Sequence, residues 1–128
     1  MDPQTINVIA TTTIGFLIPH LAKVGDAITK KIGEDIYQVL KTRFSRKPVA
    51  QETLTDLEEA PNDSDLQAAL RVQLKKLLAE DEAFAGQLQN LLQKAGETEA
   101  GATVIKQVAG DNAKQFGQVF GNVTFGQD

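Results

Sequence analysis

The first hydrophobic stretch of the chain runs from Pro3 to Ala22 and contains no Lys, Arg, Asp or Glu. Asp2 followed by Pro3 is a plausible helix start, because Pro fits the first position of a helix. The stretch is about as long as a membrane span requires, but its run of three threonines and Pro19 make it a poor permanent anchor. Three interpretations stay open: a buried core helix, a helix that enters a membrane when it is exposed, and a permanent transmembrane helix. If the helix enters a membrane on exposure, the inserting side chains are Ile6, Val8, Ile9, Ile14, Phe16, Leu17 and Ile18.

A second, amphipathic helix is predicted over residues 21–40, where apolar side chains recur every three or four positions. Gly25, Thr29 and Gly33 form a row of small residues within it, at every fourth position. Such a row lets another helix backbone approach closely, either in a membrane helix pair or in a tightly packed soluble bundle. The sequence is compatible with both arrangements.

Four cations follow at the end of this helix, before Pro48: Lys41, Arg43, Arg46 and Lys47. Cations are favourable at a helix C-terminus, where the helix dipole is negative. The same cluster surrounds an aromatic residue and could hold the head groups of anionic lipids. Nucleic acid is a weaker alternative ligand, because one short basic cluster on an acidic chain attracts it poorly.

Three further helices are predicted before residue 96. The first spans residues 49–60 and is stopped by Pro61, and the second begins at a capping cluster over residues 62–65. The second carries regularly spaced leucines: Leu66, Leu70, Leu74, Leu77 and Leu78. The last begins at Asp81 or Glu82 and ends near Gly96. We therefore predict an all-α chain, with an antiparallel bundle of four or five helices over residues 1–95.

The remaining residues differ from this helical pattern. Residues 96–102 are predicted as a flexible linker, and residues 103–128 as a β-prone tail with Gly beside Asp or Asn, a combination that favours turns. The segment QVAGD at residues 107–111 recurs eleven residues later as QVFGN, and polar and apolar residues alternate after Val119. Each copy of the segment is therefore expected to form a short strand followed by a turn.

Short strands alone are marginal in water, and stacking on identical segments supplies their missing partner. We therefore predict amyloid-like self-assembly of the tail, with a disordered tail or a hairpin folded on the bundle as the alternatives. The residues expected to stack are Val104, Ile105, Gln107, Val108, Gly110, Asn112, Gln115, Phe116, Gly117, Gln118, Val119, Phe120, Gly121, Asn122, Val123 and Phe125.

Composition argues against several classes of chemistry. The 128 residues contain no Cys and a single histidine, His20, so thiolate chemistry, disulfides and His-based catalytic groupings are not expected. The chain also lacks a phosphate-binding Gly-Lys-Ser/Thr loop. We predict no enzymatic activity, no metal site and no cofactor. The net charge of -4 gives no general affinity for nucleic acid.

Three segments make the chain resemble the bacterial Bell domain, also described as a bacterial death-like domain. They are TIGFLIPHLAKVGDAITKKIGEDIYQVLKTRF, DSDLQAALRVQLKKLLAEDEAFAGQLQNLL and the tail QVAGDNAKQFGQVFGNVTF. The tail is similar to a bacterial amyloid signalling motif of the RIP homotypic interaction type. Gln115, Phe116 and Gly117 fit the last three positions of that motif's core, and Lys114 stands where an aliphatic residue is expected.

The resemblance implies an effector of programmed cell death in bacterial immunity. In such systems an NLR-like receptor with a matching motif templates the tail into an amyloid, and the apolar first helix of the gathered bodies then attacks the membrane, for example by forming a pore. The implied partners are other copies of the chain, the receptor and membrane lipid, but not nucleic acid. The implied location is the cytoplasm at rest and the cell membrane on activation. The alternative is a death-like adaptor that binds other domains of its kind and touches no membrane, and a third option is a plain structural bundle.

Overall fold

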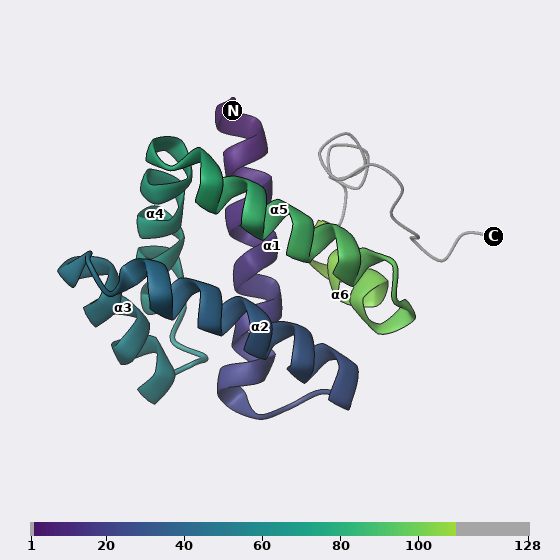
Figure 1. Cartoon of the computed structure of the whole chain (residues 1–128). Coiled ribbons are helices and arrows are strands. Elements are labelled where there is room, and N and C mark those ends of the chain that lie inside the picture. The colour runs from purple at the N-terminus through teal and green to yellow at the C-terminus, as the bar shows by residue number, and fades with distance from the viewer. Residues whose placement is uncertain (1, 110–128) are drawn as a thin grey trace.

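The computed structural model describes residues 2–109, and these residues form a bundle of helices (Figure 1). In chain order the helices are α1 (Pro3–Ala22), α2 (Ala27–Phe44), α3 (Pro48–Glu59), α4 (Ser64–Glu80), α5 (Glu82–Gly96) and α6 (Glu99–Ala109). The predicted all-α class is confirmed. The bundle has one helix more than the upper number predicted, because α6 forms where a linker and the start of the tail were expected.

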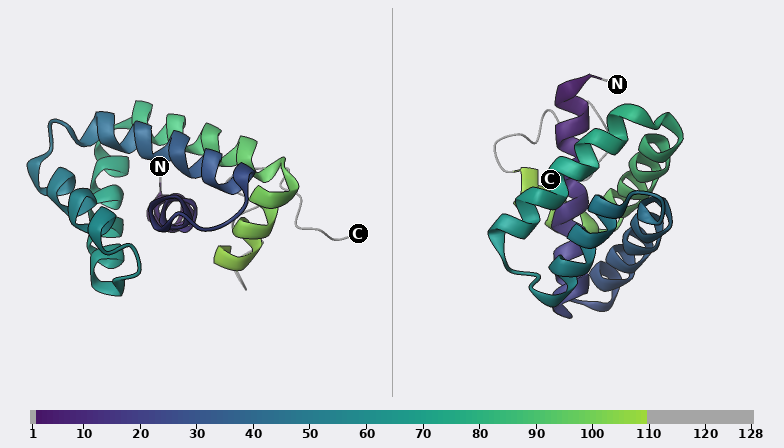
Figure 2. Two further views of the ribbon diagram at one scale, coloured as in Figure 1. Left: turned by 90° about the horizontal axis from the view of Figure 1, so that it is seen from below. Right: turned by 90° about the vertical axis from the view of Figure 1, so that its left-hand side faces the viewer.

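Helix α1 is the centre of the bundle and contacts each of the other five helices. Seen along its axis, α1 has α2 and α5 across one side, α4 on one flank and α6 on the other (Figure 2). Its apolar residues are distributed around the helix rather than along one face, which is typical of a helix that is buried on most sides. The core-helix interpretation therefore describes α1 in this structure.

Aspartates begin four of the helices. The side chains of Asp2, Asp26, Asp63 and Asp81 each accept a hydrogen bond from a backbone N–H in the first turn of α1, α2, α4 and α5. Such N-caps satisfy donors that have no partner inside the helix. The hydrogen bonds from Thr5 and Thr29 hold the pKa of Asp2 and Asp26, respectively, below the ordinary value. The four capping aspartates therefore fix where these helices start.

The predicted second helix is wrong at its start, because a turn separates α1 from α2. Lys23 adopts a left-handed conformation with φ of 60° and its N–H bonds to carbonyls of the last turn of α1. Gly25 has φ of 98°, a conformation that glycine adopts without strain. Gly25 therefore belongs to the turn and not to a row of small residues within a helix.

The remaining small residues of that row, Thr29 and Gly33, are buried where α2 crosses α1. A Cβ atom on Gly33 would lie 2.6 Å from the backbone oxygen of Phe16 and 2.6 Å from Cβ of His20. Glycine is required here because the two backbones approach too closely for a side chain. In this structure the close approach serves packing inside the bundle, the second of the two arrangements that the sequence left open.

The prediction of a linker at residues 96–102 and of strand from residue 103 is wrong within the described residues, since α5 extends to Gly96 and α6 covers Glu99–Ala109. The Thr98 hydroxyl accepts a hydrogen bond from the N–H of Gly101 at 2.9 Å and starts α6. Ala102 and Ile105 are then buried, Ile105 completely. Burial of these side chains at helical spacing outweighs the β propensity of Thr103 and Val104, because such propensity depends strongly on context.

Most of the predicted stacking residues lie outside the described residues. They are Gly110, Asn112, Gln115, Phe116, Gly117, Gln118, Val119, Phe120, Gly121, Asn122, Val123 and Phe125. The other four, Val104, Ile105, Gln107 and Val108, lie on α6. The division of the chain into an effector body and a signalling tail stays a prediction.

Candidate functional site

The predicted membrane-inserting residues form a large part of the bundle core. Ile6, Ile9, Ile14, Phe16 and Leu17 are buried, and Val8 and Ile18 are partly buried against the same core. Among the described helices, α1 alone is long and apolar enough to cross a membrane by length and composition, a property that core helices of soluble proteins share. Contact of the five buried side chains with lipid therefore requires the bundle to open.

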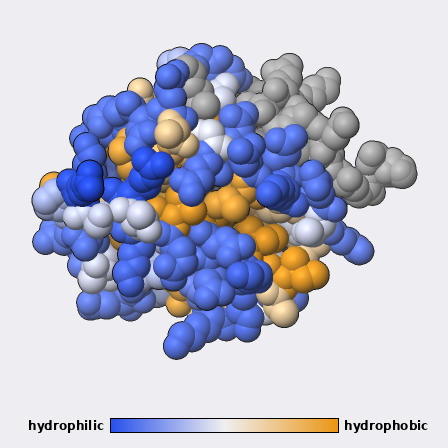
Figure 3. Space-filling view, in the orientation of Figure 1, coloured by the Kyte–Doolittle hydropathy of each residue, from blue (hydrophilic) through white to orange (hydrophobic). Residues whose placement is uncertain are grey.

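The face of the molecule seen in Figure 3 is mainly hydrophilic, with an apolar band that runs from its middle to the lower right and smaller apolar patches at the left. Val39 and Leu91, which are partly buried against the core, belong to α2 and α5 on this side of the molecule. Large apolar side chains that are exposed are few and lie on separate elements: Val24, Ile28, Val49 and Val72. Scattered residues of this kind are ordinary on soluble proteins. The resting bundle thus keeps most of its apolar side chains in the core.

The core contains a hydroxyl group that has no hydrogen-bond partner among the described residues. Thr13 is completely buried in α1, and its hydroxyl makes no hydrogen bond within the described part of the chain. A buried hydroxyl that lacks a partner typically costs about 1–3 kcal/mol. The resting position of α1 is therefore less stable than an entirely apolar helix would make it.

Helix α1 is covered unevenly. In the end-on view of Figure 2, the described helices lie above and beside α1, and none lies on its remaining side. Gln4 and Asn7 are exposed, and Thr11, Gly15 and Ile18 continue the same helical face with intermediate exposure. One long side of α1 is therefore less enclosed than the sides that face α2 and α4.

Helix α6 borders this less enclosed side. Gly15 of α1 contacts Val108 of α6, and a Cβ atom on Gly15 would overlap a methyl group of Val108. Ile105, one turn earlier on α6, is completely buried. Helix α6 also contacts α2 and α5. Helix α6 thus covers part of the central helix, and it contains residues of both the predicted linker and the predicted stacking tail.

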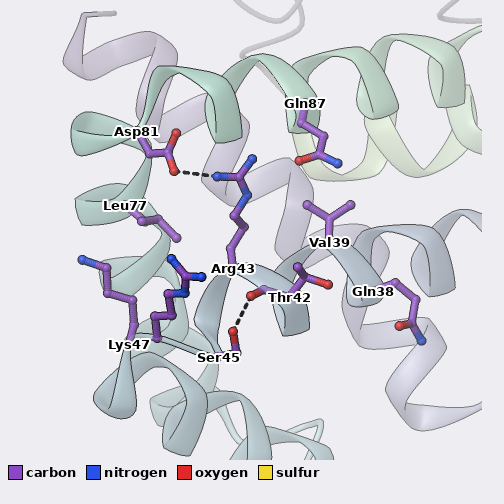
Figure 4. A pocket seen from close by; sticks show the side chains of 10 residues that line it. Gln38, Val39, Thr42, Arg43, Ser45, Lys47, Leu77, Asp81 and Gln87 are labelled. Atoms are coloured by element: carbon purple, nitrogen blue, oxygen red, sulfur yellow. Dashed lines mark hydrogen bonds and ion pairs between the residues drawn. The ribbon is translucent and has the colours of Figure 1, made fainter.

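Three of the four predicted lipid head-group residues, Arg43, Arg46 and Lys47, line a cavity of about 650 Å³ at the end of α2 (Figure 4). An Arg43 Nη atom donates to an Asp81 carboxylate oxygen at 2.8 Å, and its guanidinium lies over the ring of Phe84 at 5.9 Å. The second oxygen of Asp81 accepts from the backbone N–H of Phe84 at 3.0 Å. Arg43 is therefore held from two sides by the start of α5.

The other three cations of the cluster differ in their surroundings. Lys47 forms an ion pair with Glu80 at 3.4 Å, with both side chains at least half exposed, so the pair contributes little stability. Arg46 lines the cavity and makes no ion pair with a described residue. Lys41 does not line it and lies 5.9 Å from the ring of Tyr37 instead. The structure brings Arg43, Arg46 and Lys47 together and separates Lys41 from them.

Several lining residues were not among the predicted site residues. They are Gln38, Val39, Thr42, Ser45, Leu77, Asp81 and Gln87. Asp81 carries a capping signal in the sequence, but its ion pair with a residue 38 positions earlier depends on how α2 packs against the junction of α4 and α5. Gln87 points toward the cavity from α5, on the wall opposite α2 (Figure 4).

A second cavity of about 720 Å³ lies near the turn between α1 and α2 and is lined by His20, Tyr37 and three lysines, among others. The Tyr37 hydroxyl donates to Glu58 of α3 at 2.9 Å, and the rings of His20 and Tyr37 are 5.5 Å apart. Burial of the hydroxyl raises the pKa of Tyr37, and the hydrogen bond to Glu58 raises it further. These contacts join α1, α2 and α3 and assign a packing role to His20 and Tyr37.

The family model of the Het-E N-terminal domain matches residues 1–127. No curated protein and no solved structure matches the chain. The match supports the cell-death character that the sequence resemblance implied, whereas the Bell domain and the amyloid tail remain predictions. The chain therefore belongs to the Het-E N-terminal domain family and is a domain of the cell-death-related effector type.

Proposed function

We propose that this protein is a membrane-targeting cell-death effector that is inactive while α1 is buried and becomes active when α1 is released. The observation that carries the proposal is the position of α1. A helix of 20 residues without charge, long enough to cross a membrane, is the element around which the whole bundle packs. Its side chains are favourable in an apolar environment of either kind, protein core or lipid.

The release of α1 is coupled to the C-terminal residues in this proposal. Val104, Ile105, Gln107 and Val108 form part of α6, and they are also the first residues predicted to stack. A backbone segment cannot pair in stacked strands and stay in a helix at the same time, since each N–H can serve only one of these arrangements. Stacking that includes these residues therefore removes α6 from α1.

The proposed partners follow from the same scheme. Copies of the chain stack through their tails, an NLR-like receptor with a matching motif supplies the template, and membrane lipid is the target of α1. The protein would reside in the cytoplasm at rest and at the cell membrane on activation, and it would act without an enzymatic step. The family match supports the cell-death outcome of this scheme.

A disulfide between α1 and α6 tests the proposal. In Gly15→Cys/Val108→Cys the Cβ atoms would be 3.5 Å apart, within the range that disulfides require, and the methyl group that overlaps a Cβ on Gly15 is removed. The chain has no other cysteine, so the bond is unambiguous. We expect the oxidised variant to release no dye from vesicles when preformed aggregates of a peptide of residues 103–128 are added. Reduction of the same sample should restore release.

The reduced double variant and each single variant are the matched controls. Equal release by the oxidised and reduced forms would show that α6 need not leave α1. If neither the oxidised nor the reduced protein releases dye while the aggregates are present, membrane action is contradicted and a death-like adaptor is favoured. A peptide that stays monomeric at high concentration would contradict the stacking of the tail.

A further inference from the structure

We propose that the cavity between the end of α2 and the start of α5 binds a phosphate group, carried by a lipid head group or by a soluble molecule. The described residues that line this cavity belong to α2, to the turn after it and to α4 and α5 with the junction between them, and none belongs to α1. The proposal rests on the proposed function for its connection to membranes, but the binding of phosphate stands on the cavity alone.

The charge of the cavity is opposite to that of the chain. Arg43, Arg46 and Lys47 line it, and Asp81 is the single acidic residue among its described lining residues. The chain as a whole carries a formal charge of -4. An excess of cations in a recess of an acidic protein creates a local positive potential, which attracts an anion to that place rather than to the general surface.

Arg43 is oriented before any ligand arrives. Its guanidinium is fixed by Asp81 and by the ring of Phe84, and Asp81 is itself fixed as the N-cap of α5. The bond to Asp81 uses one of the five N–H donors of the guanidinium. The side chain is 34% exposed, so the remaining donors are partly shielded from water. Arginine in such a position matches the geometry of phosphate oxygens, and little side-chain entropy is lost on binding.

Arg46 and Lys47 supply charge that the resting structure leaves available. Arg46 makes no ion pair among residues 2–109, and the pair of Lys47 with Glu80 is long and exposed to water. A phosphate oxygen can therefore replace water at the Arg46 guanidinium without breaking a buried contact. The formation of a charge-assisted hydrogen bond to Arg46 is then a net gain.

Neutral donors complete the cavity from both walls. Thr42 lies on α2, and the amide group of Gln87 lies opposite on α5 (Figure 4). The Ser45 hydroxyl already donates to the Thr42 carbonyl at 2.7 Å and stabilises the end of α2. Cations on one wall and a neutral amide on the other suit a compact tetrahedral anion better than an apolar ligand, since among the described lining residues only Val39 and Leu77 are apolar.

The test measures binding to the resting full-length chain and needs no leakage of vesicles. Calorimetry with inorganic pyrophosphate examines a soluble phosphate, and co-sedimentation with vesicles of phosphatidylcholine and phosphatidic acid examines a lipid phosphate, with pure phosphatidylcholine as reference. Arg46→Gln removes the cation that is not ion-paired and is expected to weaken binding about tenfold or more. Lys30→Gln removes the same charge at the opposite, exposed end of α2 and should have no effect.

The two arms identify the source of the phosphate. Dependence on Arg46 in both arms supports a site that accepts phosphate from either source, dependence in the lipid arm alone supports a lipid ligand, and dependence in the pyrophosphate arm alone supports a soluble one. Absence of binding in both arms would overturn it. Equal weakening by Arg46→Gln and Lys30→Gln would also overturn it, because diffuse charge would then explain the binding. Neither result depends on whether α1 is released, so failure of the proposed function is recognised separately.

Discussion

At the scale of single residues, Thr13 of α1 places a polar group in the hydrophobic core of the bundle. Its hydroxyl is completely buried and without a partner in the described part of the chain. Thr13→Val keeps the branched shape and removes the hydroxyl, so we expect the free energy of unfolding to rise by about 1 kcal/mol. Chemical denaturation followed by circular dichroism measures the change.

Thr53→Val is the matched control for this substitution. The Thr53 hydroxyl is bonded to the Val49 carbonyl at an exposed position, so its loss should change stability by less than about 0.5 kcal/mol. A destabilised Thr13→Val variant would mean that the hydroxyl does have a partner in solution. Under the proposed function, the stabilised variant should also release vesicle contents more slowly, because α1 then leaves the core less easily.

At the scale of helices, the crossing of α1 and α2 depends on the absence of a side chain at Gly33. A Cβ atom there would approach the Phe16 carbonyl oxygen to 2.6 Å, and a backbone atom cannot yield as a flexible side chain does. We expect Gly33→Ala to force the helices apart and to destabilise the bundle by about 1–3 kcal/mol. Thermal and chemical unfolding of the purified variant measure the loss.

The same substitution of Gly by Ala at position 86 of α5 is expected to stabilise the protein instead of destabilising it. A Cβ atom on Gly86 would meet no heavy atom within 4 Å. Gly86→Ala should therefore stabilise the protein by roughly 0.5–1 kcal/mol, the usual advantage of Ala over Gly inside a helix. If both variants were equally stable, helix propensity and not the close approach of α1 and α2 would govern Gly33.

At the scale of the whole molecule, the aspartate caps make the bundle sensitive to acid. Folding lowers the pKa of Asp2 and Asp26, chiefly through backbone hydrogen bonds from Thr5 and Thr29. Their contribution to stability is therefore complete above the ordinary pKa of 3.8 and is lost as the pH falls through the lower value of the folded state. We expect the free energy of unfolding to decline below about pH 4, where α1 and α2 lose their caps.

Asp26→Asn separates this effect from general acid denaturation. Asparagine still caps a helix but does not titrate in this range, so the variant should lose less stability than the wild-type protein as the pH falls. Denaturant titrations over a series of acidic pH values give the comparison. Parallel curves for the two proteins would mean that the cap at α2 does not contribute to the acid response.

The pattern of residues alone was enough to predict much of this bundle. The spacing of apolar residues and the positions of prolines and capping residues predicted the bounds of α3, α4 and α5 closely. Proline, aspartate caps and regularly spaced leucines act on their neighbours in the chain. The same local signals were misleading at two places. Gly25 was assigned to a helix although it has the positive φ of a turn, and residues 99–109 were assigned to a linker and a strand although they form α6.

What the sequence by itself determined is the all-helical class, the starts of α1, α4 and α5 and the presence of one long helix without charge. These properties depend on neighbours in the chain and on the composition of each segment. Only the tertiary structure decided that α1 is the central helix, that Val108 contacts Gly15, and that Asp81 holds Arg43 at a cavity from which Lys41 is absent. The physical reason is that burial and ion pairing join residues far apart in the chain, and local periodicity does not specify which distant segments will meet.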